Sequence, residues 1–197
     1  MVLDLNATFI SVMNNAKDLD VCSKTFVKDI HAMTTSHQLR SDEQGLVRKN
    51  VVIITGCEYK PLESPIQLEA EFDYLISVMK DIQDPFEQAA YIHCNLAYLQ
   101  YFADGNKRTS RLMQTAVLAH NNLTPVFMRA EEISNYLKAV IRYYETGDRR
   151  SYADLFIRSY RYTIDNLLNR LPEQLEDIAE DEKRLQEARA KRQKRPL

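Results

Sequence analysis

The sequence has 197 residues, 45% of them hydrophobic, which is enough for one domain with a buried core and room for an appendage. With only 4 Gly and 6 Pro and no Trp, the composition favours helices over a turn-rich sandwich or barrel, so we expect an all-α fold. The net charge of −2 gives no overall attraction for nucleic acid or an acidic membrane, and any anion site is therefore local.

Cysteine usage and the first residues bear on the compartment. Cys22, Cys57 and Cys94 are odd in number and far apart, without the spacing of a disulfide framework or a zinc site. An acid, Asp4, stands where a signal peptide needs basic residues, and no apolar run approaches the ~20 residues that cross a bilayer. We therefore expect a soluble, unprocessed, cytoplasmic protein without a membrane span.

Two packing helices are predicted at the start of the chain. Apolar residues recur at helical spacing from Leu5 to about Asp18 and again from Ser23 through Met33. A polar break follows at 41–45. The β-branched residues of the sequence then cluster in residues 46–56. This cluster predicts a short β-hairpin, or flap, that turns near Gly56.

The same periodicity predicts the remaining helices. One begins at Pro61 to Pro65 and ends before Asp84, and a central helix continues from Pro85 to Tyr101. A turn at 104–106 separates it from the next helix, which closes at Asn121-Asn122. Two further helices are expected over 130–144 and 152–171, with the turn 146–148 between them.

The core signal fades after Leu171, which divides the chain into a domain over 1–171 and a charged helical or disordered tail over 172–197. Seven acidic residues lie between Glu173 and Glu187, and five basic residues lie from Arg189 to Arg195. Such a basic end suits nucleic acid or a membrane surface, but no aromatic residues alternate with the charges. A solubilising end is therefore favoured over nucleic-acid binding.

The segment Asp104-Gly-Asn-Lys-Arg-Thr-Ser-Arg111 has the composition of an anion site. If a helix begins just after Gly105, its first N–H groups point outward unpaired, and the helix dipole adds positive potential. The glycine lets a phosphate approach the backbone. The polar side chains that surround this point are Asn106, a neutral donor, and the cations Lys107, Arg108 and Arg111.

Asp104 is the exception, an acid beside a proposed phosphate site. Its carboxylate repels a bare phosphate, but Mg²⁺ between the two reverses the interaction. The alternative is a plain turn with solvated charges, which Asp-Gly-Asn alone would favour because such tripeptides are common turn formers. The whole segment instead favours a nucleotide bound with Mg²⁺.

The stretch Gln100-Tyr-Phe-Ala-Asp-Gly-Asn-Lys-Arg-Thr-Ser-Arg111 resembles the motif of the Fic/Doc family, His-x-Phe-x-Asp/Glu-Gly-Asn-Gly/Lys-Arg-x-x-Arg, at every position but the first. Ala90-Tyr-Ile-His93 resembles the family's preceding helix, and Gly45-Leu-Val-Arg48 resembles the stretch before its flap. The likeness covers roughly Ser23 to Leu168. It implies a Fic-type helical bundle whose members transfer AMP, or less often another phosphate-containing group, to a protein hydroxyl.

This resemblance implies a role for each matching position. Asp104 takes Mg²⁺, and the phosphates of ATP or another nucleotide are held by Gly105, Asn106, Lys107, Arg108 and Arg111. A protein target docks by strand pairing on the flap residues Val52, Ile53, Ile54, Thr55 and Gly56. Many members carry an inhibitory Ser/Thr-x-x-x-Glu motif that this sequence lacks, which fits either a protein without a brake or one controlled by a regulatory partner protein.

Two positions depart from the family pattern. Lys107 is usually glycine in AMP-transferring members and lysine in the Doc branch, whose members phosphorylate with the nucleotide reversed. Gln100 replaces the histidine that deprotonates the attacking hydroxyl, and a neutral amide cannot accept that proton. Loss of a general base costs roughly 10²- to 10⁴-fold in rate.

No other side chain is an evident replacement for that base. His93 lies two turns back along the helix and is predicted to be a hydrogen-bonded core residue, while Tyr101, with an ordinary pKa of about 10, is a poor base. His31, His37 and His120 lack a motif context. The sequence leaves open an adenylyltransferase with weakened or altered catalysis, a Doc-like phosphotransferase, and an inactive Fic-fold binding or regulatory module.

Overall fold

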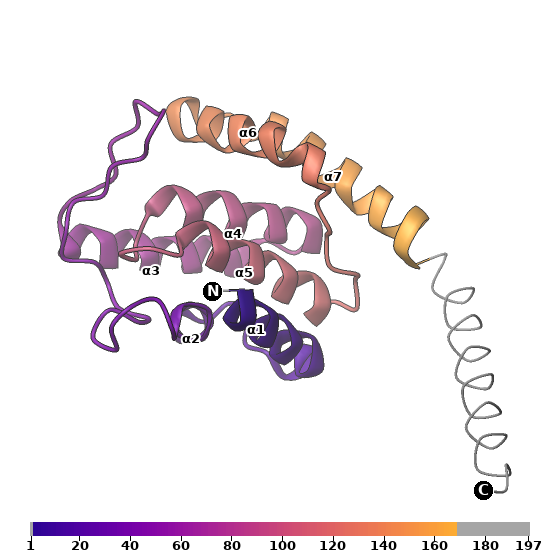
Figure 1. Ribbon diagram of the computed structural model, residues 1–197, viewed down its shortest axis with the longest axis horizontal. Coiled ribbons are helices and arrows are strands. Elements are labelled where there is room, and N and C mark those ends of the chain that lie inside the picture. Colours follow the sequence, from indigo (N-terminus) through magenta and orange to yellow (C-terminus); the bar gives the residue numbers. More distant parts are fainter. Residues whose placement is uncertain (1, 169–197) are drawn as a thin grey trace, which may run out of the picture.

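A computed structural model of the chain describes residues 2–168, and within them it contains helices and connecting loops but no β-strand (Figure 1). The expected all-α fold is confirmed. The α-helices of this part are α1 Val2–Asn14, α2 Lys24–Thr35, α3 Pro65–Asp81, α4 Pro85–Leu99, α5 Asn106–His120, α6 Ile133–Thr146 and α7 Arg150–Thr163. Short 3₁₀ turns cover Ala16–Asp18 and Ala130–Glu132, and a π-helical turn, Ile164–Leu168, follows α7.

Three helices begin at side-chain caps. The caps are Ser23 for α2, Ser64 for α3 and Asp84 for α4, and each side-chain oxygen accepts a hydrogen bond from the backbone N–H three residues on. Pro65 and Pro85 then occupy the first helical positions, where the missing N–H has no cost. These helix starts therefore leave few backbone donors exposed.

Helices α4 and α5 form the centre of the fold. They pack on each other, α4 also packs on α3, α6 and α7, and α5 also packs on α1 and α2 (Figure 1). Fully buried side chains from these layers include Phe72, Ile92, Leu96, Met113 and Leu118. Each stabilises the fold by roughly 1.5–3 kcal/mol relative to exposure. The turn between α4 and α5 is consequently held between two well-packed helices.

The predicted β-hairpin is wrong as a strand pair, although the chain does turn at Thr55-Gly56, where Gly56 has φ +76°. Residues 49–63, here called the flap loop, run out and back as two stretches side by side, in purple at the left of Figure 1. No backbone hydrogen bond joins the two stretches. Val51 and Ile53 are 62% and 87% exposed, and an isolated hairpin with exposed apolar side chains is marginal in water.

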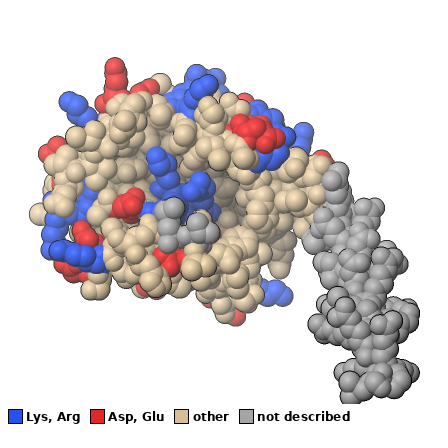
Figure 2. All heavy atoms as spheres, in the orientation of Figure 1, with Lys and Arg blue, Asp and Glu red and all other residues tan. Residues whose placement is uncertain are grey.

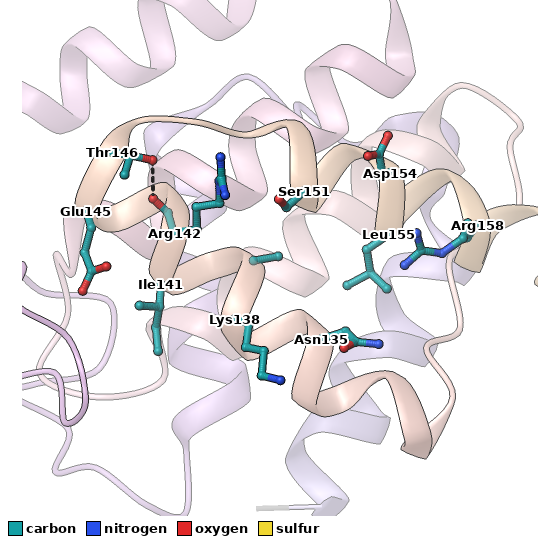
Figure 3. Close-up of a pocket in the computed structure, with 11 residues that line it drawn as sticks. Asn135, Lys138, Ile141, Arg142, Glu145, Thr146, Ser151, Asp154, Leu155 and Arg158 are labelled. Carbon is teal, nitrogen blue, oxygen red and sulfur yellow. Dashed lines mark hydrogen bonds between the residues drawn. The ribbon is translucent and has the colours of Figure 1, made fainter.

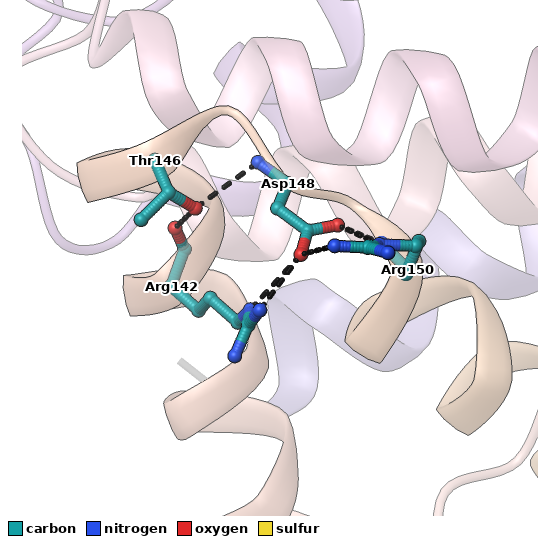
Figure 4. A network of polar contacts seen from close by, with 4 residues as sticks. All are labelled: Arg142, Thr146, Asp148 and Arg150. Carbon is teal, nitrogen blue, oxygen red and sulfur yellow. Dashed lines mark hydrogen bonds and ion pairs between the residues drawn. The ribbon is translucent and has the colours of Figure 1, made fainter.

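A polar cluster closes the turn between α6 and α7 (Figure 4). Gly147 ends α6 in the left-handed conformation, with φ +71°. The Asp148 carboxylate accepts from the guanidinium groups of Arg142 and Arg150, each at 2.9 Å, and from the Arg150 backbone N–H at 3.0 Å. These contacts lower the Asp148 pKa, first through the Arg150 side chain. The Asp148 carboxylate is thus paired within this region of the fold.

None of the helices within residues 2–168 has the length and apolarity needed to cross a membrane. The division into a domain over 1–171 and a tail over 172–197 stays a prediction, because the tail lies outside the described residues.

Candidate functional site

Helix α5 begins without a cap. Gly105, at its N-cap, has no side chain, and the first backbone bond into the helix runs from Thr109 N–H to the Gly105 carbonyl at 2.9 Å. The N–H groups of Asn106, Lys107 and Arg108 have no acceptor within the described part of the chain. Three donors therefore stand open at the positive end of a 15-residue helix, which is the arrangement that binds anions.

Gly105 is required here by both conformation and space. Its φ is +79°, a backbone conformation that residues other than glycine rarely adopt. A Cβ at this position would lie 2.8 Å from Thr35 Cγ2 and 3.4 Å from His31 Nε2. Helix α2 therefore packs directly against the loop of residues 100–105 that joins α4 to α5, here called the motif loop.

His31 bridges two segments beneath the motif loop. Its Nδ1 accepts from the Gly45 N–H at 2.8 Å, so Nε2 carries the proton and donates to the Asp104 carbonyl at 2.9 Å. Its ring stacks on Phe102 with centroids 3.7 Å apart. Burial lowers the His31 pKa to about 4, so the ring is neutral at pH 7. No role was predicted for this histidine, because its hydrogen-bond partners lie 14 and 73 residues away in the chain.

Asp104 and Arg108 form an ion pair at the edge of the site. The carboxylate accepts from the Gly105 N–H at 2.5 Å and from Arg108 Nη2 at 2.9 Å, while the Asp104 side chain stays 66% exposed. Arg108 also donates to the Gln38 side-chain carbonyl and is only 15% exposed. Asp104 thus keeps free lone pairs that face solvent, as a ligand for a hard cation requires.

Lys107 and Arg111 supply positive charge without a counter-charge. Neither makes an ion pair with any acid in residues 2–168, and the Arg111 guanidinium lies over the Tyr136 ring at 5.8 Å. Figure 2 shows basic side chains gathered in a hollow over α4 and α5, with acidic atoms beside them. The start of α5 therefore combines unpaired backbone donors with unpaired cations.

The flap loop and the motif loop enclose one cavity of about 460 Å³. Its lining brings together almost all the residues predicted for the site, which are Val52, Ile53, Ile54, Thr55, Gln100, Asp104, Gly105, Asn106, Lys107, Arg108 and Arg111, with Ala103 in addition. Gly56, predicted with the flap, lies at the turn and outside this lining. No group of three or more His, Cys, Asp or Glu side chains in the described residues could hold a metal, so Mg²⁺ would need nucleotide oxygens beside Asp104.

The Asn106 side chain faces inward. Its Oδ1 accepts from the Phe102 N–H at 2.9 Å, and its Nδ2 donates to the Phe102 carbonyl at 2.8 Å and to Gln100 Oε1 at 3.3 Å. Only 5% of Asn106 is exposed. The side-chain amide predicted to reach phosphate instead braces the motif loop, and the open donor of this residue is its backbone N–H.

Gln100 ends α4 in the left-handed conformation, with φ 49° and ψ 45°. Its Nε2 donates to the Ala97 carbonyl at 2.6 Å, and only 7% of the residue is exposed. Since its Oε1 also accepts from Asn106, the amide joins the end of α4 to the start of α5 and both of its ends are used. Gln100 lines the cavity at the position where the family pattern has its base, yet it acts here as a brace.

No histidine lines the cavity. His93 is buried, as predicted, with Nε2 3.2 Å from the Tyr136 hydroxyl, and burial lowers its pKa to about 3. Tyr101 is fully buried and donates to Glu69 Oε1 at 2.5 Å, and burial raises its pKa far above the ordinary value. Neither side chain can therefore replace the missing base.

A larger groove of about 680 Å³ lies between α6 and α7 (Figure 3). Its lining mixes charges of both signs, with Lys138 and Arg158 beside Glu145 and Asp154. None of the motif residues lines it. The larger volume is thus not a guide to the functional site, because the smaller cavity contains the motif residues.

Comparison with known proteins links this cavity to one family. Residues 21–118 match the sequence pattern of the Fic/DOC family. The protein adenylyltransferase Fic of Nematostella vectensis is 34% identical over 141 residues, covering 71% of this chain and 33% of that protein. The Drosophila willistoni protein of the same name is 25% identical over 184 residues, covering 91% of this chain and 36% of that protein. The chain therefore spans about a third of the length of these relatives.

Solved structures share the fold. Fic-1 from C. elegans superposes with a TM-score of 0.69 at 18% identity, covering 85% of this chain and 51% of that structure. The BepC protein of Bartonella tribocorum, determined with bound AMPPNP, superposes with a TM-score of 0.59 at 16% identity, covering 79% of this chain and 83% of that structure. At these identities the likeness establishes the helical architecture.

Proposed function

This chain belongs to the Fic/DOC family, matched over residues 21–118, and from that premise we propose that the cavity between the flap loop and α5 binds ATP or another nucleotide with Mg²⁺. The observation that carries the proposal is the open start of α5. Three N–H donors, at Asn106, Lys107 and Arg108, lie beside two unpaired cations in a cavity large enough for a nucleotide. The AMPPNP found in the Bartonella relative supports the same ligand class.

Each group at the site has a defined part in this proposal. The N–H groups at the start of α5, together with Lys107 and Arg111, hold phosphate oxygens. Asp104 holds Mg²⁺, which when bound screens the phosphate charge. Arg108, now paired with Asp104 at 2.9 Å, is placed to exchange part of that contact for phosphate. The residues present thus fit a nucleotide and its metal.

We propose further that the family reaction, AMP transfer from ATP to a protein hydroxyl, is weakened or altered in this chain. In that reaction the target hydroxyl oxygen bonds to the α-phosphorus while the bond to pyrophosphate breaks, and the hydroxyl proton must leave. Gln100 can orient the hydroxyl but cannot take its proton. The relatives named adenylyltransferases support the reaction class, and the protein target would lie along the flap loop.

The second candidate is a binding or regulatory module without transfer. It is favoured by the Gln100 amide, which bonds to the Ala97 carbonyl and Asn106 and so has a structural use independent of catalysis. A Doc-like phosphotransferase is the third reading, and it rests on Lys107 in place of glycine. For both the adenylyltransferase and the Doc-like phosphotransferase, the proposal includes control by a regulatory partner protein.

Calorimetric titration with ATP and Mg²⁺ tests the binding site. Arg111→Ala should weaken binding at least tenfold, since a charged hydrogen bond contributes about 1.5–3 kcal/mol. Arg150→Ala, which changes an arginine of similar setting in the α6–α7 turn, is the matched control and should leave the affinity within about twofold. Absence of binding at millimolar nucleotide, or equal affinity in both variants, would refute the site.

The Gln100→His variant separates the transferase from the binding module. Histidine tolerates the left-handed conformation better than most residues, so the variant should fold. With labelled ATP and a lysate, transfer by the variant should exceed that of the natural protein by about 10²- to 10⁴-fold if only the base is missing. A folded variant that binds ATP and Mg²⁺ but modifies nothing would favour the binding module.

A further inference from the structure

Arg48 is a buried arginine between the two loops of the cavity. Only 3% of it is exposed, and its guanidinium donates to three backbone carbonyls. Nε donates to Gln100 at 2.6 Å, Nη1 donates to Asn50 at 2.7 Å, and Nη2 donates to Leu62. Its own backbone N–H donates to the Tyr101 carbonyl at 3.0 Å. One side chain therefore joins the outgoing stretch of the flap loop, its returning stretch and the motif loop.

The cation has no acid partner at ion-pair distance among the described residues. Burial is the main cause that lowers the Arg48 pKa, and the guanidinium still stays charged at pH 7. Its planar fork presents five N–H donors in fixed directions, whereas a lysine ammonium is a single point. The guanidinium of arginine can therefore reach three carbonyls on three different segments at once, whereas the ammonium of lysine cannot.

Few other polar contacts hold the flap loop, although Ile54, Cys57 and Tyr59 also pack against the core. The returning stretch is attached through Tyr59, which stacks on Tyr98 at 4.2 Å and donates to its carbonyl, and through the Glu58 N–H, which donates to Glu145 at 3.1 Å. The backbone from Val51 to Gly56 makes no hydrogen bond with any described residue. The backbone of the outgoing stretch thus has its polar anchor at its base, where Arg48 binds the Asn50 carbonyl.

We infer that Arg48 is a positioning residue that fixes the flap loop to the motif loop, so that the two walls of the cavity keep one separation. The residue touches the cavity through the Gln100 carbonyl and contacts no group assigned to nucleotide binding. Its consequence for target docking rests on the proposed function. If a protein target lies along Val52 to Thr55, Arg48 sets the distance from that target to the start of α5.

The ordering of the flap loop can be measured without any ligand. Backbone NMR order parameters of Val51 to Gly56 should be near 0.85 in the natural chain and should fall below about 0.6 in Arg48→Lys and Arg48→Met. Arg40→Lys is the matched control, because Arg40 is 75% exposed and pairs with Asp42 and Glu43. Arg48→Lys keeps the charge and remains informative if Arg48→Met does not fold.

Unchanged order parameters in a folded Arg48 variant would overturn the inference, as would an equal loss of order throughout the helices. The Gln100→His background adds a readout that a general loss of stability would not give. There, Arg48→Lys should raise the KM for the protein target at least tenfold and leave the ATP affinity within about threefold. A rise in the target KM matched by an equal loss of ATP affinity would contradict a positioning role. Failure of the natural chain to bind ATP would refute only the proposed function.

Discussion

The turn that joins α4 to α5 and the turn that joins α6 to α7 have similar residues and opposite behaviour. Each contains a left-handed glycine, Gly105 or Gly147, beside an aspartate and followed by basic residues. In the α6–α7 turn the Asp148 side chain is 16% exposed and accepts from two arginines, whereas Asp104 is 66% exposed and pairs with one. The α6–α7 turn therefore pairs its aspartate within the fold, whereas the α4–α5 turn leaves much of its aspartate open to solvent.

This difference shows that composition does not distinguish a binding turn from a structural turn. The distinction lies in whether the charged side chains beside the helix start are already paired. In the α6–α7 turn the Arg150 N–H donates to Asp148, while the N–H groups that begin α5 have no acceptor in the described chain. Unpaired donors at the positive end of a helix, beside unpaired cations, are what an incoming phosphate would satisfy.

The largest expected effect comes from adding a methyl group at each glycine. Gly105→Ala should lower the free energy of unfolding by about 2–5 kcal/mol, because the left-handed conformation costs about 1–2 kcal/mol and overpacking adds to it. Gly147→Ala should cost only about 1–2 kcal/mol, since nothing lies within 4 Å of its added Cβ. Denaturant unfolding of both variants measures the difference.

A second substitution isolates the steric part of that effect. Thr35→Ser removes the Cγ2 that lies 2.8 Å from the added Cβ and keeps the hydroxyl that donates to the His31 carbonyl. In a double-mutant cycle it should recover part of the stability lost in Gly105→Ala and none of that lost in Gly147→Ala. Equal costs at the two glycines would show that α2 does not support the motif loop as described.

The next effect is a dependence of stability on pH that comes from His31 beneath the α4–α5 turn. The His31 pKa falls from 6.5 to about 4 on folding, so the unfolded chain takes up the proton first as the pH drops. The stability from neutral His31 is complete above pH 6.5 and is lost as the pH falls toward 4, on the order of 3 kcal/mol.

His31→Gln should therefore lower the slope of the unfolding free energy against pH between those values, while the part of the slope that buried His93 contributes remains. His120→Gln, at the other end of α5, is the control and should leave the slope unchanged. If His31→Gln keeps the natural slope, the buried neutral imidazole does not cause the loss of stability at low pH.

The smallest effect compares the two aspartates. Asp148→Asn should lower the melting temperature by a few degrees, because it removes the charge that Arg142 and Arg150 share. Asp104→Asn should leave the melting temperature nearly unchanged but reduce the gain in ATP affinity that Mg²⁺ gives. The reverse pattern, with Asp104 needed for stability and Asp148 needed for the effect of Mg²⁺, would contradict the roles assigned to the two turns.

Much of the fold could be predicted from local signals. The cap Ser23, the prolines at 65 and 85, and the break at 121–122 mark helix ends that the structure confirms. Gly105 lies at the turn before α5, as predicted, and all the predicted site residues except Gly56 line one cavity. The β-hairpin prediction was wrong because β-branched residues report a preference for extended backbone and not the presence of a partner strand.

The support of the site could not be predicted in the same way. His31, Thr35 and Arg48 act on the motif loop from positions more than 50 residues away in the chain, and a single sequence gives no pairing information at that range. The inward orientation of the Asn106 side chain depends on the Phe102 backbone, which becomes available only once the loop is folded. These contacts belong to tertiary structure and have no local sequence signal.

The most direct test of the central claim is an amide-detected NMR titration of the natural chain with ATP and Mg²⁺. We predict saturable shifts, largest for the N–H groups of Asn106, Lys107 and Arg108, because these donors gain phosphate acceptors. The N–H groups of Gly147 to Arg150 should not shift. Absence of shifts at millimolar nucleotide, or larger shifts at the α6–α7 turn than at the start of α5, would contradict the account.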